Sequence, residues 1–264
     1  FLIIFCSYSL FYISTEMLPQ KHRPSYLTAF SVLILAKFLF REINLGQINA
    51  LVTLVLLLMI RTIAFPKKTE ATQREIRAGI LWGLATALKP YSLIFFPYFI
   101  VKKKWKVLLS GIGFISLALL APSLYYGIKG NTIVIKEWII TFSQSTPSLL
   151  TSGDNISIMA FFMKWTGNQN ASFILSGMIF TLLALLILIA IFKGKEMART
   201  SVLECSILLI LIPIVSPLGW DYTLLLSVLG ITIIIHNFFN FLKIWRIILI
   251  VNFLIISLSI YDLM

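Results

Sequence analysis

The stretch AGILWGLATALKPYSLIFFPYFIV at residues 78–101 decides the predicted fold. It is apolar along most of its length, but Lys89 and Pro90 stand at its centre. A proline removes a helical hydrogen bond and disfavours helix at the preceding residue, so it divides the stretch into two arms. Each arm of about 11 residues would rise about 16 Å, roughly half of the hydrocarbon thickness of a membrane. We therefore expect a re-entrant pair of half-helices rather than one crossing.

Basic segments on both sides of this stretch support the re-entrant interpretation. PKKTEATQREIR (66–77) precedes it, and KKKWK (102–106) follows it. Because Lys and Arg mark cytoplasmic loops, both ends of the stretch belong on the inner side of the membrane. The same rule places three more basic loops inside, namely KHR (21–23), KGKEMAR (193–199) and the region of Lys243 and Arg246.

The composition places the rest of the chain in the membrane as well. Hydrophobic residues make up 59% of the 264 positions and charged residues 12%, which leaves too little polar surface for a water-soluble globule. The net charge of +12 is concentrated in short loops, so it indicates membrane orientation rather than nucleic-acid binding. The other apolar segments, which must be helical in lipid, fall at 1–15, 26–40, 47–65, 106–126, 171–192, 201–219, 222–239 and 246–262.

The predicted fold is therefore all-α, a single polytopic transmembrane domain over the whole chain. It has about eight spans plus the re-entrant hairpin, with both termini outside. The outer face then carries REINLGQIN (41–49), a long loop (127–170) and the Ser216–Tyr222 turn. Two apolar patterns in the long loop, IVIKEWII and ISIMAFFMKW, predict short interfacial helices with Trp138 and Trp165 at headgroup level.

Two charged residues at membrane depth are the strongest candidates for chemistry. Asp221 stands between two apolar runs, and an ionisable group there is costly enough to suggest a function. The alternative is an ordinary external turn, broken by Pro217 and Gly219. Lys89 lies at the apex of the predicted hairpin, where half-helix ends can bind a charged group such as phosphate. The alternative is that its long side chain snorkels to an interface.

Polar residues near the predicted outer face are weaker candidates. Gln47 and Asn49 begin a span, where their amides either bind sugar hydroxyls or cap the helix. Asp154 and Asn155 follow a glycine in the long loop, where a turn is the commoner explanation. Of the other acidic residues, Glu204 lies towards the cytoplasm, and four are interpreted as interfacial or solvated: Glu16, Glu42, Glu137 and Asp262.

The signatures of several other enzyme classes are absent from the sequence. It contains no phosphate-cradling glycine loop, nucleophile elbow, HExxH helix or DxD carboxylate pair. Cys6 and Cys205 stand alone in apolar stretches, without metal-ligand or redox spacing. We therefore expect no metal and no cofactor. An outer-face enzyme also lacks access to cytoplasmic nucleotide sugars, so its activated donor would arrive attached to a lipid.

Four patterns in the chain, in this order, resemble one family: LGQIN (45–49), GLATALKPYSLIFFPYF (83–99), DNISIMAFF (154–162) and SPLGWDYTLL (216–225). Together they are similar to the C-terminal two-thirds of glycosyltransferase family 87. These are GT-C-type membrane enzymes that include polyprenol-phosphate-mannose-dependent mannosyltransferases. The resemblance implies inverting transfer of a hexose, mannose above all, from a polyprenyl-phosphate donor. The acceptor would be a glycolipid or cell-envelope glycan on the outer face of the plasma membrane, with no nucleic-acid partner.

The resemblance also implies roles for individual residues. Lys89 and Tyr222 would bind the donor phosphate, and Asp221 would act as a second acid or base. Gln47, Asn49, Asn155 and Trp220 would bind the sugar or the acceptor. The family places its main catalytic aspartate in its first outer loop, so we expect that residue to precede Phe1 and this chain alone to be inactive. The family's Trp-Asp-His pattern reads Trp220-Asp221-Tyr222 here, which puts the role of that histidine in doubt.

Two other classes of protein stay open from the sequence. A transporter or flippase of lipid-linked sugars would share the broken helix with its central lysine. A non-catalytic membrane subunit would retain the scaffold alone. Transporters often carry polar residues along the whole path, whereas the candidates here concentrate in the predicted outer half. That asymmetry favours an enzyme.

Overall fold

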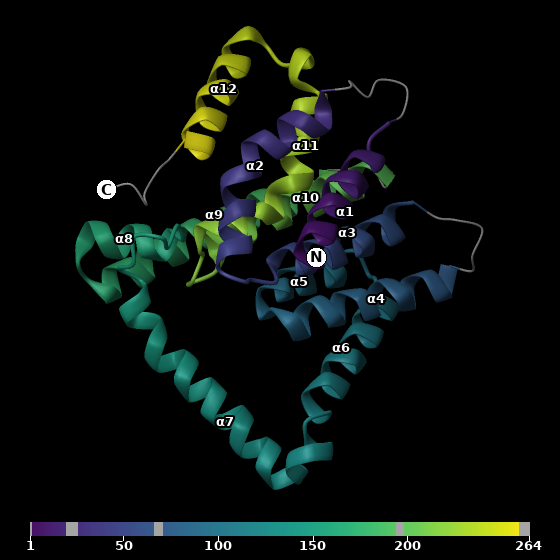
Figure 1. Cartoon of the computed structure of the whole chain (residues 1–264), viewed down its shortest axis with the longest axis vertical. Helices are drawn as coiled ribbons and strands as arrows, with labels where there is room; N and C mark the ends of the chain where they lie inside the picture. Colours follow the sequence, from purple (N-terminus) through teal and green to yellow (C-terminus); the bar gives the residue numbers. More distant parts are fainter. Residues whose placement is uncertain (1, 20–25, 66–70, 194–197, 259–264) are drawn as a thin grey trace.

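The computed structural model describes residues 2–19, 26–65, 71–193 and 198–258, and over these residues the chain is all-helical, as predicted (Figure 1). The elements, in chain order, are α1 (Leu2–Glu16), α2 (Leu27–Asn44), α3 (Asn49–Ala64), α4 (Ala71–Leu88), η2 (Pro90–Ile94), α5 (Phe95–Val101), α6 (Trp105–Leu120), α7 (Ser123–Leu149), α8 (Ile158–Thr166), α9 (Gln169–Lys193), α10 (Ala198–Val215), η3 (Asp221–Ser227), α11 (Val228–His236), η4 (Phe238–Asn240) and α12 (Lys243–Leu258), where η denotes a 3-10 helix.

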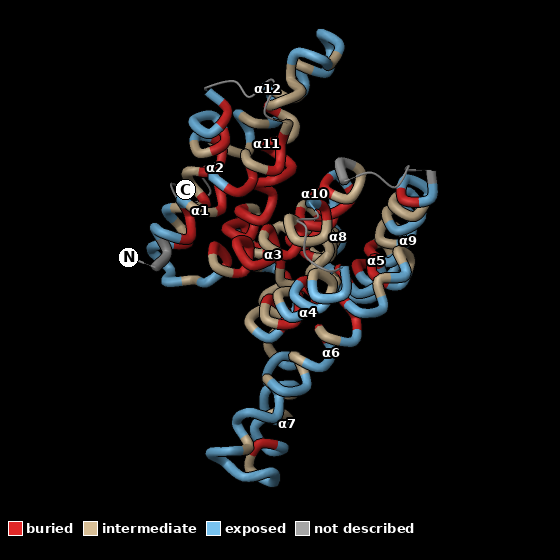
Figure 2. The backbone as a smooth tube through the Cα atoms, turned by 90° about the vertical axis from the view of Figure 1, so that its right-hand side faces the viewer, coloured by how far each residue is buried: buried red, intermediate tan, exposed pale blue. Residues whose placement is uncertain are grey.

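The core of the protein is built around α3. Leu56, Leu57 and Met59 of this helix are completely buried, and α1, α2, α4, α10 and η3 pack against it. Figure 2 shows that the buried residues are concentrated in this bundle, while α7 and α12 are largely exposed or partly exposed. The N-terminal end of α3 thus lies in the interior, where packing on several sides holds the residues of a site in fixed positions.

The helices support a membrane protein without fixing the number of crossings. Gln169–Phe192 is the one described helix that is long and apolar enough to cross by itself, and 11% of its most apolar window is buried. A soluble core helix of this kind would be mostly buried, so its apolar surface suits lipid. The predicted eight spans and outside termini stay predictions. Several residues used for the predicted orientation lie outside the described residues: Lys21, Arg23, Lys67, Lys68 and Lys195, as does Asp262.

The predicted break at Lys89 and Pro90 is present. Lys89 follows the last residue of α4 with extended backbone (φ −145°, ψ 113°), and η2 begins at Pro90. The indole of Trp82 packs edge-on against Phe99, with ring centroids 5.4 Å apart. Its Nε1 donates a hydrogen bond to the Ser92 carbonyl oxygen over 2.9 Å. The second arm therefore folds back on the first as a helical hairpin.

The two basic flanks of the hairpin meet at its open end. Lys104, after α5, lies 3.0 Å from Glu75 in the first part of α4, measured from Nζ to Oε1. Lys106 Nζ donates to Thr72 Oγ1 over 2.6 Å. A segment that crossed a membrane once would hold these residues far apart, so the contacts support the predicted arrangement. That the hairpin dips into a membrane and returns stays a prediction.

The first arm of the hairpin is longer than predicted. α4 begins at Ala71, seven residues before the expected start at residue 78. The added segment ATQREIR contains Ala, Gln, Glu and Arg, which are good helix formers, so its polarity does not stop the helix. α6 then packs closely along α4, where a Cβ added to Gly83 would lie 2.7 Å from the Gly111 carbonyl oxygen. This contact fixes the hairpin against its neighbour.

The long loop at 127–170 differs from its expected form. IVIKEWII does not form a short helix but belongs to the 27-residue α7, which bends 91° away from α6. A separate kink lies inside α7 at Gly127, whose backbone is non-helical with φ 67°. Beyond it no proline follows until Pro147, so the helix continues. ISIMAFFMKW does form the short helix α8. The interfacial position of Trp138 and Trp165 stays a prediction.

Candidate functional site

Two loops that are far apart in the sequence are joined by backbone hydrogen bonds, and the candidate site is built on them. The Ile156 amide donates to the Gly219 carbonyl oxygen over 2.7 Å, and the Asp221 amide donates to the Asp154 carbonyl oxygen over 3.1 Å. Gly219 is required here, because an added Cβ would overlap the Pro213 carbonyl oxygen. The patterns at 154–162 and 216–225 therefore meet in one place.

Arg41, at the last turn of α2, joins the acidic side chains of these two loops. Its Nη1 lies 2.7 Å from Asp221 Oδ2, and its Nη2 lies 2.6 Å from Asp154 Oδ2. The side chain of Arg41 is 15% exposed, and that of Asp221 is 5% exposed. A guanidinium can donate from two nitrogens at once in a fixed geometry, which suits this bridge. The bridge orients Asp221 from the side of α2.

One carboxylate oxygen of Asp221 has no hydrogen-bond partner among the residues that the structure describes. Its Oδ2 accepts from Arg41, whereas its Oδ1 is buried and accepts no hydrogen bond in the described part of the chain. Burial raises the pKa of this carboxyl above its usual range, and the Arg41 guanidinium opposes that shift. A buried polar atom without a partner is costly, so it marks a position where a ligand group would be stabilised.

A second cluster surrounds the beginning of α3. Glu42 Oε1 accepts from the Ala50 amide over 2.8 Å, and its Oε2 accepts from Asn49 Nδ2 over 2.9 Å. Asn49 Oδ1 in turn accepts from the Tyr91 hydroxyl over 2.9 Å. The interpretation of Glu42 as solvated was therefore wrong, because its side chain caps a helix and is completely buried. Its interfacial position stays a prediction. Glu42, rather than Asn49, satisfies the amides at this helix start.

Lys89 lies at the apex of the hairpin and reaches the same region. Its Nζ donates to Gln47 Oε1 over 3.3 Å, and both residues are half-buried. The ammonium does not turn back along the hairpin towards the basic flanks, which would be the direction of snorkelling to the inner side. The hairpin therefore brings a cation to the loop that precedes α3.

Tyr222 connects the two clusters. Its ring stacks on that of Trp220, with centroids 6.4 Å apart and planes 11° from parallel. The phenol is 8% exposed and interacts electrostatically with both Glu42 and Asp221. Tyr91, from the hairpin, interacts with Tyr222 and Glu42 in the same way. One polar region thus extends from Lys89 to Asp221.

Two of the acidic or amide candidates have other roles in the structure. Asn155 is 2% exposed, and its Nδ2 donates to the carbonyl oxygens of Leu149 and Pro217. Its amide therefore ties loops together instead of pointing to open space. Glu204 pairs with Lys102 at 2.8 Å, near the base of the hairpin. This position agrees with the prediction that it does not reach the outer site.

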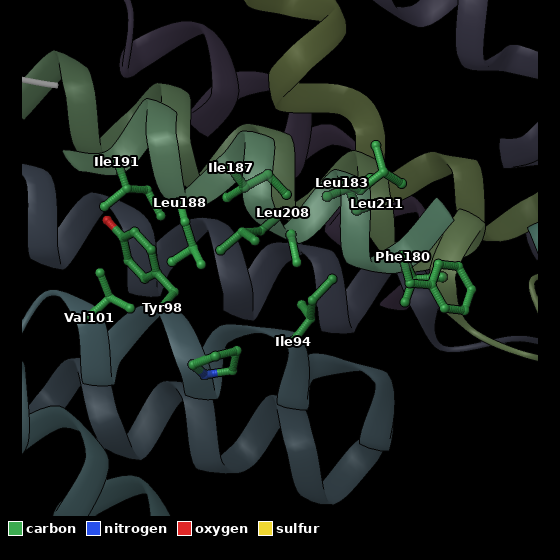
Figure 3. Close-up of a pocket in the computed structure, with 13 residues that line it drawn as sticks. Ile94, Tyr98, Val101, Phe180, Leu183, Ile187, Leu188, Ile191, Leu208 and Leu211 are labelled. Carbon is green, nitrogen blue, oxygen red and sulfur yellow. The ribbon is translucent and has the colours of Figure 1, made fainter. Parts of the chain in front are cut away.

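An apolar groove runs beside the hairpin between α5, α9 and α10 (Figure 3). It encloses about 310 Å³, with Tyr98 and Val101 at one end and Ile94 and Leu211 towards the other. Val215, which also lines it, is the last residue of α10 and directly precedes the turn that carries Asp221. An apolar chain lying in this groove would therefore end near the polar region.

Sequence reasoning missed the contribution of Arg41 and Glu42. Both stand in REINLGQIN, where Glu42 is interpreted from the sequence as interfacial or solvated and Arg41 is given no role. The signal that could have identified them is their position next to Gln47 and Asn49, which are candidates from the sequence. The partners of Arg41 lie 113 and 180 residues away, so no local pattern pointed to them.

Comparison with known proteins gives one family. The model of glycosyltransferase family 87 matches residues 2–217 of the chain. This range contains the first three patterns singled out above and ends just inside the fourth, so Asp221 and Tyr222 lie shortly beyond it. No curated protein and no solved structure matches the chain.

Proposed function

The chain belongs to glycosyltransferase family 87, and from that premise we propose that it transfers a hexose, mannose, from polyprenyl phosphate to a glycolipid or cell-envelope glycan. The proposed reaction takes place on the outer face of the plasma membrane. Family membership supports a membrane glycosyltransferase in general. The donor, the sugar, the acceptor and the side of the membrane are parts of this proposal.

The proposed reaction is a single displacement at the anomeric carbon. The acceptor hydroxyl attacks that carbon, the bond from the carbon to the phosphate oxygen breaks, and the configuration inverts. The acceptor proton passes to a base, and the products are the glycoside and polyprenyl phosphate. A positioned base contributes about 10²- to 10⁴-fold to such a reaction. The phosphate leaves as an anion, so a nearby cation stabilises the transition state.

The observation that carries this proposal is the buried Oδ1 of Asp221, which has no hydrogen-bond partner among the described residues and lies in the polar region that Lys89 also enters. An acceptor hydroxyl could donate to this oxygen. Arg41 holds the other oxygen, so the carboxylate is already oriented. In this proposal Asp221 positions the acceptor or serves as a second acid or base.

The donor fits the opposite part of the polar region. Lys89 stands at the hairpin apex with Gln47 beside it, and an ammonium there would offset the charge of the phosphate. The groove between α5, α9 and α10 would take the isoprenoid chain. Gln47 and Trp220 would contact the sugar, and Tyr222 would contact the donor phosphate with Lys89. Asn49 would act indirectly, because it is completely buried and both of its amide atoms are already bonded to Glu42 and Tyr91. Asn155 would act indirectly, because its amide holds the loops that carry Asp221.

A transfer assay tests the proposal. The chain, expressed with any native sequence that flanks it, is reconstituted in vesicles with radiolabelled polyprenyl-phosphate mannose and a membrane extract as acceptor. We expect a new alkali-stable glycosidic product, and none with polyprenyl-phosphate glucose. Movement of the labelled lipid across the bilayer without a glycosidic product would contradict transfer and support a flippase.

A further inference from the structure

The apex of the hairpin, which consists of Lys89, Pro90 and Tyr91, is held at two points. Lys89 Nζ donates to Gln47 Oε1 over 3.3 Å, and the Tyr91 hydroxyl donates to Asn49 Oδ1 over 2.9 Å. Both partners belong to the short segment that joins α2 to α3. The ring of Pro90 restricts the backbone between the two contacts. The position of the Lys89 ammonium therefore depends on how this segment is held.

The backbone of Glu42 holds the first of the two partners. The Gln47 amide donates to the Glu42 carbonyl oxygen over 3.0 Å, and the Gly46 amide donates to the Ile43 carbonyl oxygen over 3.2 Å. Gly46 has φ 60°, which glycine adopts without strain. These two hydrogen bonds form the Schellman arrangement that ends many helices. They hold the backbone of Gln47 against the last turn of α2.

The side chain of Glu42 orients the second partner. Its Oε2 accepts from Asn49 Nδ2 over 2.9 Å, and its Oε1 accepts from the Ala50 amide over 2.8 Å. A carboxylate can only accept hydrogen bonds, so it requires the Nδ2 side of the Asn49 amide to face it. Asn49 Oδ1 then faces Tyr91. A glutamine at this position could also donate, so the Asn49 amide could take either orientation.

The start of α3 does not by itself require a glutamate as its cap. Neutral side chains such as Ser, Thr and Asn cap helices well. Glu42 is completely buried, and a buried carboxylate costs more free energy than a neutral polar group. What the carboxylate adds is a second oxygen that only accepts, and this oxygen sets the direction of the Asn49 amide.

We propose that Glu42 is a positioning residue for the donor site, because it holds the apex of the hairpin where the Lys89 ammonium meets the donor phosphate. This inference rests on the proposed function, in which Lys89 binds that phosphate. Glu42 is completely buried, so it acts through Gln47 and Asn49 and does not touch the donor. Its neighbour Arg41 orients Asp221. The last turn of α2 thus positions both the cation and the carboxylate of the site.

The reactivity of Lys89 tests this inference without turnover. The chain, with any native sequence that flanks it, is treated in detergent with a water-soluble acetylating reagent, and acetylation of Lys89 is followed by mass spectrometry. We expect Glu42→Gln to raise the rate about three- to tenfold, because the apex loses an oriented hydrogen bond. Tyr91→Phe leaves Glu42 in place and removes only the hydroxyl at the other end of these contacts, so it should raise the rate to the same extent. An unchanged rate in Tyr91→Phe would contradict the inference even if Glu42→Gln did not fold.

The double variant shows whether Glu42 and Tyr91 act through the same contacts. The rate in Glu42→Gln/Tyr91→Phe should not exceed that of the faster single variant, because the second substitution removes a hydrogen bond that is already lost. Rates that multiply would show that the two residues act independently, and the inference would be wrong.

Glu204→Gln is the matched control. Glu204 is also a buried carboxylate that accepts from the hairpin, from the Tyr98 hydroxyl over 3.0 Å and from Lys102 Nζ over 2.8 Å. These contacts lie at the base of the hairpin instead of its apex. Glu204→Gln should lower the thermal unfolding midpoint and leave the acetylation rate of Lys89 unchanged. An equal rise in rate in Glu204→Gln and Glu42→Gln would show a general loosening of the hairpin and overturn the inference.

Donor binding separates this inference from the proposed function. Polyprenyl phosphate should protect Lys89 from acetylation, and Glu42→Gln should require about tenfold more of it. In the transfer assay Glu42→Gln should raise KM for the donor and leave KM for the acceptor unchanged, whereas a variant that is merely less stable loses kcat alone. If Glu42→Gln changes the reactivity of Lys89 but polyprenyl phosphate never protects it, the proposed function is contradicted and the positioning role stands. If polyprenyl phosphate protects both proteins equally, the inference is wrong.

Discussion

Arg41 Nη1 lies 2.7 Å from Asp221 Oδ2, although 180 residues separate the two in the chain. This ion pair connects the end of α2 with the turn before η3, and Asp154 joins it through the second guanidinium nitrogen. It leaves the other oxygen of Asp221 without a partner in the described part of the chain. The ion pair therefore both stabilises the fold and orients the carboxylate on which the proposed function depends.

Removal of Arg41 should destabilise the protein. Arg41→Gln leaves the buried charge of Asp221 uncompensated, and breaking a mostly buried ion pair costs about 3 kcal/mol or more. We expect a clearly lower thermal unfolding midpoint in detergent. Arg61→Gln is the matched control, because its pair with Glu16 is 40% and 26% exposed and should contribute less than about 1 kcal/mol. Equal midpoints for the two variants would show that the Arg41 bridge contributes little.

Asp221→Asn should silence sugar transfer while preserving the shape of the side chain. Loss of a positioned acid or base lowers the rate by about 10²- to 10⁴-fold. Binding of the donor, measured with radiolabelled polyprenyl-phosphate mannose, should change little because Lys89 lies at the other end of the polar region. Asp154→Asn is the comparison, since the Asp154 side chain is 36% exposed, and it should retain more activity. Full activity in Asp221→Asn would remove this residue from the mechanism.

The rate of transfer should depend on pH through Asp221. Burial raises the pKa of its carboxyl, so the charged form is lost at a higher pH than for an ordinary aspartate. Activity that needs the carboxylate should therefore fall as the pH drops through this raised value. Arg41 opposes the shift, so a weaker ion pair in Arg41→Lys should move the acid limb of kcat/KM to higher pH. An acid limb that stays in place, or moves to lower pH, would contradict this role.

Lys89→Ala should weaken binding of the donor more than it affects folding. The ammonium donates to Gln47 Oε1 over 3.3 Å, and a charge-assisted contact with phosphate would be lost. We expect KM for the polyprenyl-phosphate donor to rise about tenfold or more, for a loss of about 1.4 kcal/mol or more. Lys136→Ala, on the exposed side of α7, is the control. A KM that rises equally in both variants would indicate a general charge effect.

The positions of most helices could be predicted from the sequence because apolar runs and a single proline determine them locally. The hairpin is the clearest case, since Pro90 disfavours helix at Lys89 and the helix ends there. The length of α7 could not be predicted in the same way. Its polar and apolar residues are mixed along its whole length, so the sequence alone does not show whether it forms one long helix or a loop with short helices.

The sequence predicted which motifs contribute to the site, but it did not predict which side chains contact one another. Asp221 and Lys89 were noticeable because charges are rare in apolar stretches. Glu42 stands two residues from the end of α2, and from sequence alone a carboxylate there is as consistent with solvent as with a buried cap. Its burial depends on the start of α3, whose Ala50 amide donates to Glu42, and on Tyr91 of the hairpin, which donates to Asn49. Such contacts arise from tertiary packing, which single-sequence patterns do not contain.

The most direct test of the account is the side of the membrane on which the two ends of the hairpin lie. Cysteines introduced at Glu75 and Lys104, in a variant without Cys6 and Cys205, are labelled in sealed vesicles with a maleimide that does not cross membranes. The account predicts that both are labelled from one side, and that a cysteine at Gly153, in the loop beside Asp221, is labelled from the other. Labelling of Glu75→Cys and Lys104→Cys from opposite sides would contradict it, because Lys89 would then lie within a simple crossing.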